Sequence, residues 1–153
     1  MTRRWPLTVL LLSAGLAACG GDDAPSKKEF AQNANQICRD TQKEFEQIGK
    51  SAGNPQEVAD AIDKVVDKSK KAADDLVALE RPEGADGKKA EQFTEGFKSE
   101  LNDKMVPALE DLQSALREKD VQGVQKAAAN LQKLEADKSD QYARELGATA
   151  CVG

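Results

Sequence analysis

The feature that most constrains the fold is the spacing of apolar residues, which recurs every three or four positions along four segments of the chain. This spacing matches the 3.6-residue turn of an α-helix and differs from the two-residue alternation of a half-buried strand. We expect helices at about residues 26–49, 54–80, 86–118 and 120–147. The sequence therefore predicts an all-α protein.

Local signals support these boundaries. Ser26 followed by Glu29 has the pattern of a capping box, and Asn54-Pro55 joins an N-cap residue to a proline that suits the first helical turn. Pro107 lies inside the third segment and cannot donate a backbone hydrogen bond. We expect a kink just before it.

The connections between the segments are short, and short links make neighbouring helices antiparallel. We therefore expect an up-down-up-down four-helix bundle spanning residues 26–153 as one domain. The fourth segment departs from the apolar spacing at one position, because Lys138 lies where an apolar residue is expected. A three-helix bundle with a split third helix is the alternative.

The first 18 residues have the pattern of a secretion signal. Arg3 and Arg4 precede an apolar stretch of about ten residues, and small residues lead to Cys19. This stretch is too short for a permanent membrane span, which needs about 20 residues. Residues 19–25 are polar and form a tether with a reach of about 15 Å.

The end of this leader, Leu16-Ala17-Ala18-Cys19, resembles the lipobox of bacterial lipoproteins. The resemblance implies cleavage between Ala18 and Cys19, transfer of a diacylglyceryl group to the Cys19 thiol, and often acylation of the new amino group. Each buried methylene contributes about 0.8 kcal/mol, so two or three chains anchor a protein almost permanently. The resemblance thus implies a lipid anchor on the extracytoplasmic face of a membrane. The export route stays open, because Thr2-Arg3-Arg4 also resembles part of a twin-arginine signal.

Two cysteines remain once Cys19 carries lipid. In an oxidising compartment, Cys38 and Cys151 allow one pairing. Cys38 lies about 18 Å into the first helix. Gly147 is a typical residue just beyond a helix C-terminus, and the four residues after it can reach back along that helix. We predict a Cys38–Cys151 disulfide and a tail that acts as a strap.

A second resemblance covers both ends of the mature chain. Ala34-Asn35-Gln36-Ile37-Cys38 near its start, and Leu146-Gly147 with Cys151 at its end, resemble many short helical lipoproteins and secreted proteins of actinomycete-type bacteria. This resemblance supports the compartment and the disulfide, and it implies no activity.

Composition excludes several classes of function. Removal of Arg3 and Arg4 with the leader reduces the 22 basic residues to 20, against 27 acidic ones, and the remaining basic residues are dispersed. We therefore expect no nucleic-acid partner. The chain contains no histidine, which excludes Ser-His and Cys-His nucleophiles and histidine ligands to zinc, iron or haem. We expect no catalytic residues, no metal and no cofactor, and we predict that the protein is not an enzyme.

Two hypotheses for function remain. The first is a lipid-anchored interaction or scaffold module that docks an envelope protein or a cell-wall component near the membrane. The alternative is a carrier of a small apolar ligand. It depends on Gly96 beside Phe97, on Ser69 and Ala72 in a facing seam, and on Pro107 downstream, which together could leave a gap in the core.

Overall fold

The computed structural model describes residues 24–134 and 138–152, and the regular elements in these ranges are all helical. The leader, the lipobox and Cys19, on which the predicted anchor depends, lie outside them. No helix within the described ranges is both long enough and apolar enough to span a bilayer.

The helical elements follow one another closely along the chain. In order they are α1 (Lys27–Lys50), α2 (Pro55–Val77), α3 (Gly84–Glu100), the π-turn η1 (Leu101–Met105), α4 (Val106–Glu118), α5 (Val121–Gln132), α6 (Lys138–Leu146) and the 3₁₀ turn η2 (Thr149–Cys151). The all-α prediction is confirmed.

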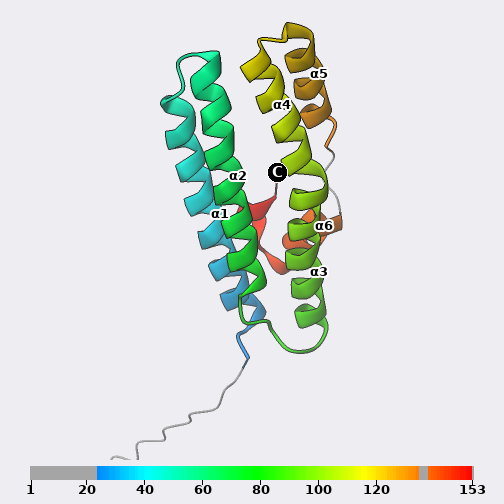
Figure 1. Cartoon of the computed structure of the whole chain (residues 1–153). Coiled ribbons are helices and arrows are strands. Elements are labelled where there is room, and N and C mark those ends of the chain that lie inside the picture. Colours follow the sequence, from blue (N-terminus) through cyan, green and yellow to red (C-terminus); the bar gives the residue numbers. More distant parts are fainter. Residues whose placement is uncertain (1–23, 135–137, 153) are drawn as a thin grey trace, which may run out of the picture.

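The first two helices form an antiparallel pair, and α3, η1 and α4 continue as one long rod beside α2 (Figure 1). The shorter α5 packs along α4, whereas α6 packs along α3. The end of the chain then returns to α1, where η2 packs. Two short helices therefore cover the long rod, α6 on its α3 half and α5 on its α4 half.

The predicted helix starts are confirmed at α1 and α2. The Ser26 hydroxyl accepts a hydrogen bond from the Glu29 backbone N–H at 3.2 Å, and the Glu29 carboxylate accepts one from the Ser26 backbone N–H at 2.8 Å. At α2, the Asn54 side chain accepts a hydrogen bond from the Glu57 backbone N–H at 3.0 Å. These bonds satisfy donors that a helix leaves free in its first turn.

The third helical segment differs in detail from the expected range of 86–118. It begins at Gly84, and the irregularity expected before Pro107 is a π-turn in which the Val106 N–H donates to the Leu101 carbonyl, five residues back. Pro107 then lies in the first turn of α4. A proline is tolerated there, because an N–H in the first turn has no partner within its own helix.

The expected single helix over residues 120–147 is wrong. It begins as predicted, since Asp120 caps α5, but α5 ends at Gln132 and Leu134 is not helical. A second helix, α6, starts at Lys138. Two features explain this break. The apolar face of the segment is interrupted at Lys138, and the two halves pack on different helices, α5 on α4 and α6 on α3.

Buried apolar side chains form two clusters at different heights along the rod. The lower cluster, toward the bottom of Figure 1, consists of Phe30, Ala34, Cys38, Leu76, Ala90, Phe93, Ala143, Leu146, Ala148 and Cys151. The upper cluster consists of Ile62, Val66, Ala73, Leu101 and Val106. Phe97 packs against both and therefore marks the junction between them.

Cys38 and Cys151 are joined by a disulfide bond. The pairing predicted from the sequence is therefore confirmed. Gly147 ends α6 with a φ of +88°, a conformation in which glycine avoids the steric strain of other residues. The chain turns there and returns along α1.

Hydrogen bonds also hold this C-terminal strap, which we define as residues 147–152, against α1. The Asn35 side-chain amide donates to the Gly147 carbonyl at 2.9 Å, and its oxygen accepts from the Ala150 N–H at 2.7 Å. One turn past Cys38, the Gln42 amide donates to the Ala150 carbonyl at 2.9 Å. The strap is thus attached at several points along the helix.

Candidate functional site

An apolar cavity of about 190 Å³ lies where the lower and upper clusters meet. It is bounded by α1, α2, the junction of α3 with η1, and the strap. Its walls consist of Cys38, Thr41, Gln42, Phe45, Ser69, Ala72, Phe97, Leu101, Met105, Ala150, Cys151 and Val152. Most of these side chains are apolar, which is typical of small-molecule sites.

Small side chains on α2 make room for this cavity. Ser69 and Ala72 are each 6% exposed, and both line it. A leucine at either position would project into the space instead. The gap expected between these residues and Phe97 is therefore found where the sequence placed it.

Two other residues of that hypothesis act differently. At Gly96, an added Cβ would lie 3.4 Å from the Ser139 side chain, so this glycine faces α6, and it does not line the cavity. Pro107 is not a lining residue either. The π-turn that precedes it contributes Leu101 and Met105 to the wall.

The strap closes one side of the cavity. Both cysteines of the disulfide line it, as do Ala150 and Val152. The hydrogen bond from Gln42 to the Ala150 carbonyl ties this wall to α1. Any movement of the strap would therefore change the shape of the cavity.

Two residues that line the cavity, Gln42 and Met105, are exposed to solvent, and Met105 is 42% exposed although it is apolar. We call these two residues the rim of the cavity. Phe45 and Phe97 also line it and are half-buried. Methionine is flexible and polarisable, and it adapts to apolar partners of different shape. Such a rim suits the entry of a small apolar molecule.

No lining residue carries a formal charge. The Thr41 hydroxyl donates to the Ile37 carbonyl at 2.9 Å, so it is already occupied within α1. Near this level, Lys68 and Glu44 form an ion pair of 3.0 Å that joins α2 to α1 and does not line the cavity. The arrangement can hold an apolar molecule, but it places no acid, base or activated nucleophile beside it.

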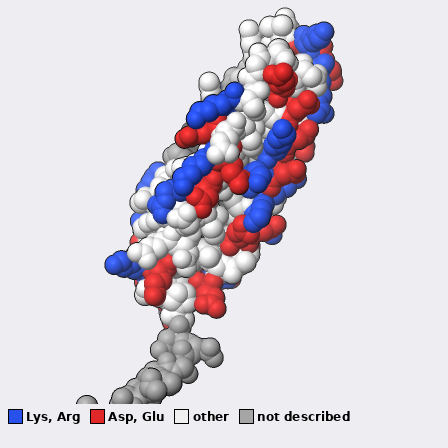
Figure 2. Space-filling view, turned by 90° about the vertical axis from the view of Figure 1, so that its left-hand side faces the viewer, with Lys and Arg blue, Asp and Glu red and all other residues white. Residues whose placement is uncertain are grey.

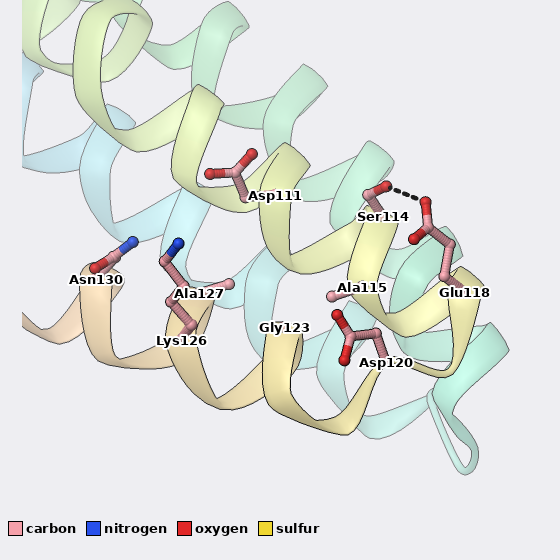
Figure 3. Close-up of a pocket in the computed structure, with 9 residues that line it drawn as sticks. All are labelled: Asp111, Ser114, Ala115, Glu118, Asp120, Gly123, Lys126, Ala127 and Asn130. Carbon is pink, nitrogen blue, oxygen red and sulfur yellow. Dashed lines mark hydrogen bonds between the residues drawn. The ribbon is translucent and has the colours of Figure 1, made fainter.

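A second, polar groove of about 300 Å³ lies between α4 and α5 (Figure 3). Its carboxylates come from Asp111, Glu118 and Asp120, and Figure 3 shows them at separate positions along the two helices. Glu118 accepts a hydrogen bond from Ser114 at 3.0 Å, while Asp120 caps α5. Within the described ranges, no group of three or more histidine, cysteine or acidic residues is arranged to hold a metal ion.

The surface formed on the left-hand side of Figure 1 carries both signs of charge. Figure 2 shows the basic and acidic side chains interleaved over this face. Some form ion pairs along or between helices, such as Lys43 with Asp40 at 3.0 Å. This face therefore offers no broad region of one sign to select an oppositely charged partner.

Comparison with known proteins identifies no relative of this chain. No family model matches it, and no curated protein or solved structure shows significant similarity to it.

Several cavity residues did not enter the sequence-based hypothesis. Phe45 and Leu101 recur at helical spacing with other apolar residues, which predicts a place in the core, and Thr41 follows the same spacing. The strap residues were expected to reach α1, but nothing in the sequence indicated that they would also wall a cavity. Of the predicted site residues, Cys38 and Cys151 line the cavity, whereas Ala18 and Cys19 lie outside the described residues.

Proposed function

We propose that the protein is a lipid-anchored carrier on the extracytoplasmic face of a membrane, which holds a small apolar ligand in the cavity between its two clusters. The single observation that carries this proposal is the apolar cavity of about 190 Å³ beside Ser69 and Ala72. We prefer it to an interaction or scaffold module because the cavity is a specific feature, whereas the charged face in Figure 2 suggests no particular partner.

The build of the cavity supports this proposal. Protein interiors are packed densely, and a gap lined by apolar atoms loses the contacts that would otherwise stabilise the core. Here the small residues Ser69 and Ala72 line the same space as the large side chains Phe45 and Phe97, and the disulfide-bonded strap forms another wall. A ligand that fills the space would recover the missing contacts.

The proposed anchor is argued from the leader and from the disulfide. Leu16-Ala17-Ala18-Cys19 has the residues of a lipobox, and a disulfide such as Cys38–Cys151 is typical of oxidising, extracytoplasmic compartments. Ser26 caps α1 only seven residues after Cys19, so the lower end of the molecule would stay near the membrane. The cavity begins about 18 Å further along α1 and would stand clear of the lipid surface.

The carrier proposal is tested with protein purified from its own host. Native mass spectrometry should show the folded chain with an additional, dissociable small molecule. Ala72→Leu should remove that mass, because the larger side chain would occupy the cavity. Ala129→Leu is the matched control, since it makes the same change at an exposed helical position on α5 and should leave the ligand bound. A chain that never carries extra mass would contradict the proposal.

The anchor is tested separately by Cys19→Ala. The variant should be released from membranes or remain uncleaved, because lipid transfer precedes processing at a lipobox. Fractionation and intact-mass measurement distinguish these outcomes. A variant that is cut at the same position and stays membrane-bound would contradict the lipid anchor while leaving the cavity proposal intact.

A further inference from the structure

The cavity wall includes a small polar side chain that makes no hydrogen bond within the described ranges. Ser69 is 6% exposed and lines the cavity from α2. Within the described ranges no hydrogen bond joins its hydroxyl to another residue, in contrast to Thr41, which donates to the Ile37 carbonyl. In the described ranges, a side-chain polar atom that is fully buried without a hydrogen-bond partner is found at Asp140 Oδ2 and not at Ser69, so the Ser69 hydroxyl stays accessible from the cavity and can bond to a molecule there.

The lack of charged residues in the cavity wall limits which ligands can bind there. None of the lining residues is acidic or basic. An ionised carboxylate or amine that entered this space would lose its hydration without gaining an opposite charge, which strongly disfavours binding. The part of the ligand that lies inside the cavity must therefore be neutral.

The volume of the cavity limits the size of the ligand. An apolar cavity of roughly 150 Å³ accommodates benzene in a well-studied engineered protein. The cavity described here is somewhat larger, at about 190 Å³. One ring with one or two small substituents, or a short aliphatic chain, would fill it.

We propose that the ligand is a neutral amphiphile of about one ring in size whose single hydroxyl or carbonyl group hydrogen-bonds to Ser69. This inference rests on the carrier function proposed above and specifies the ligand that the cavity selects. Ser69 can act as donor or acceptor, so it accommodates either group. The rest of the ligand would lie against Phe45, Phe97 and the disulfide.

The test compares three probes of nearly the same shape: p-cresol, p-xylene and p-toluate. Binding to the purified protein is followed by NMR of the Met105 methyl group at the rim, and affinities are measured by calorimetry. We expect p-cresol to bind about two- to tenfold more tightly than p-xylene, the range of one neutral hydrogen bond. The charged p-toluate should bind more weakly than both.

Variants at Ser69 show whether this preference comes from its hydroxyl. Ser69→Ala should bring the affinities for p-cresol and p-xylene together, and Ser69→Thr, which keeps the hydroxyl, should restore a difference. Ser114→Ala is the control, because Ser114 lies in the polar groove and its loss should leave the ratio unchanged. A ratio that survives in Ser69→Ala, or p-toluate binding as tight as p-cresol, would overturn this inference.

A different set of results would contradict the carrier function itself. If neither neutral probe binds, or if both bind Ala72→Leu as tightly as the unaltered protein, the cavity is not a ligand site. Equal binding of p-cresol and p-xylene to the unaltered protein, abolished by Ala72→Leu, would instead keep the carrier function and reject the role of Ser69.

Discussion

The lower and upper clusters use similar helical spacings of apolar residues, yet they bury their large side chains to different depths. In the lower cluster Phe30 and Phe93 are each 1% exposed, and Leu76 is fully buried. Around the upper cluster Leu109 and Leu112 are only half-buried. The same kind of pattern therefore leads to unequal burial in two parts of one molecule.

The difference follows from what covers each region. At the lower end α6 and the strap close over α1 and α3, and their contacts complete a ring of helices around the core. At the upper end α5 packs on α4, whereas α1 packs on α2 and has no substantial contact with α4 or α5 in the described ranges. Two packed helices bury the apolar side chains between them fully only where a further element covers those side chains. The cavity lies at the boundary between the covered lower region and the less covered upper region.

The largest expected effect on the free energy of unfolding comes from replacing one leucine with alanine in each region. Leu76→Ala should lower the free energy of unfolding by about 3–5 kcal/mol, because it empties a fully buried site. Leu109→Ala should cost only about 1–2 kcal/mol, since its side chain remains partly in water. Urea denaturation of the two variants measures both values. Equal losses would show that the two regions do not differ energetically.

Removing the disulfide should have the next largest effect. The double variant Cys38→Ser, Cys151→Ser should unfold with about 2–4 kcal/mol less free energy, because the link constrains the unfolded chain. Its circular dichroism spectrum should remain helical, while the strap should become accessible to proteases. Reduction of the unaltered protein should reproduce both results. Free alkylation of both thiols in oxidised, host-purified protein would contradict the pairing.

A smaller effect is expected from the hydrogen bonds of the strap alone. Asn35→Ala removes two bonds to the strap and should cost about 1–2 kcal/mol. Hydrogen exchange at the Ala150 amide should become faster. Asn33→Ala is the control, because Asn33 is exposed on the same helix and its loss should change stability by less than about 0.5 kcal/mol. Unchanged exchange at Ala150 would show that the disulfide alone positions the strap.

The smallest effect concerns an exposed ion pair that joins α3 to α6. The Lys89 ammonium lies 2.7 Å from the Glu145 carboxylate, and hydrogen bonds from Lys89 and Gln141 lower the pKa of Glu145. A lowered acid pKa stabilises the fold above the ordinary glutamate pKa, and this contribution is lost as the pH falls through the folded-state value.

The urea midpoint should therefore fall further between pH 7 and pH 3 in the unaltered protein than in Glu145→Gln. Glutamine has no proton to gain, so the variant lacks this contribution across the whole range. Glu91→Gln at an exposed site on α3 serves for comparison. Parallel pH curves for the unaltered protein and Glu145→Gln would show that the pair makes no measurable contribution.

Features set by local chemistry could be predicted from the sequence. The caps at Ser26 and Asn54 depend on a few adjacent residues, and the disulfide depends on a cysteine count and the reach of a short tail. The buried face of α2 was less predictable, since helical spacing fits both Val65 and Val66, and the structure buries Val66 and leaves Val65 half-buried. In its first half α2 contacts α4, where Gln113 donates to the Ala59 carbonyl at 2.8 Å, and this contact selects the buried face.

The split of the fourth segment, and the form that the irregularity before Pro107 takes, were not predicted because both depend on tertiary packing. A signal for the turn was nevertheless present. The residues Phe93, Phe97, Leu101, Met105 and Leu109 are spaced four apart throughout. In a regular α-helix this spacing drifts by about 40° at each step, or about 160° in total. A wider turn takes up part of the drift, so an uninterrupted spacing of four favours a π-turn within the stripe.

The π-turn also constrains which changes of length the protein can tolerate. A π-turn holds one residue more than an α-helical turn, so deleting one residue from 101–105 would restore a regular helix and leave the orientation of α4 relative to α3 nearly unchanged. A deletion in a regular turn of α3 or α4 would instead rotate everything beyond it by about 100° and turn the apolar face of the α4–α5 hairpin away from α2. Removed residues should therefore be found among natural variants at the π-turn and at the helix connections near residues 51–54 and 119–120, and be absent from the regular turns of α3 and α4.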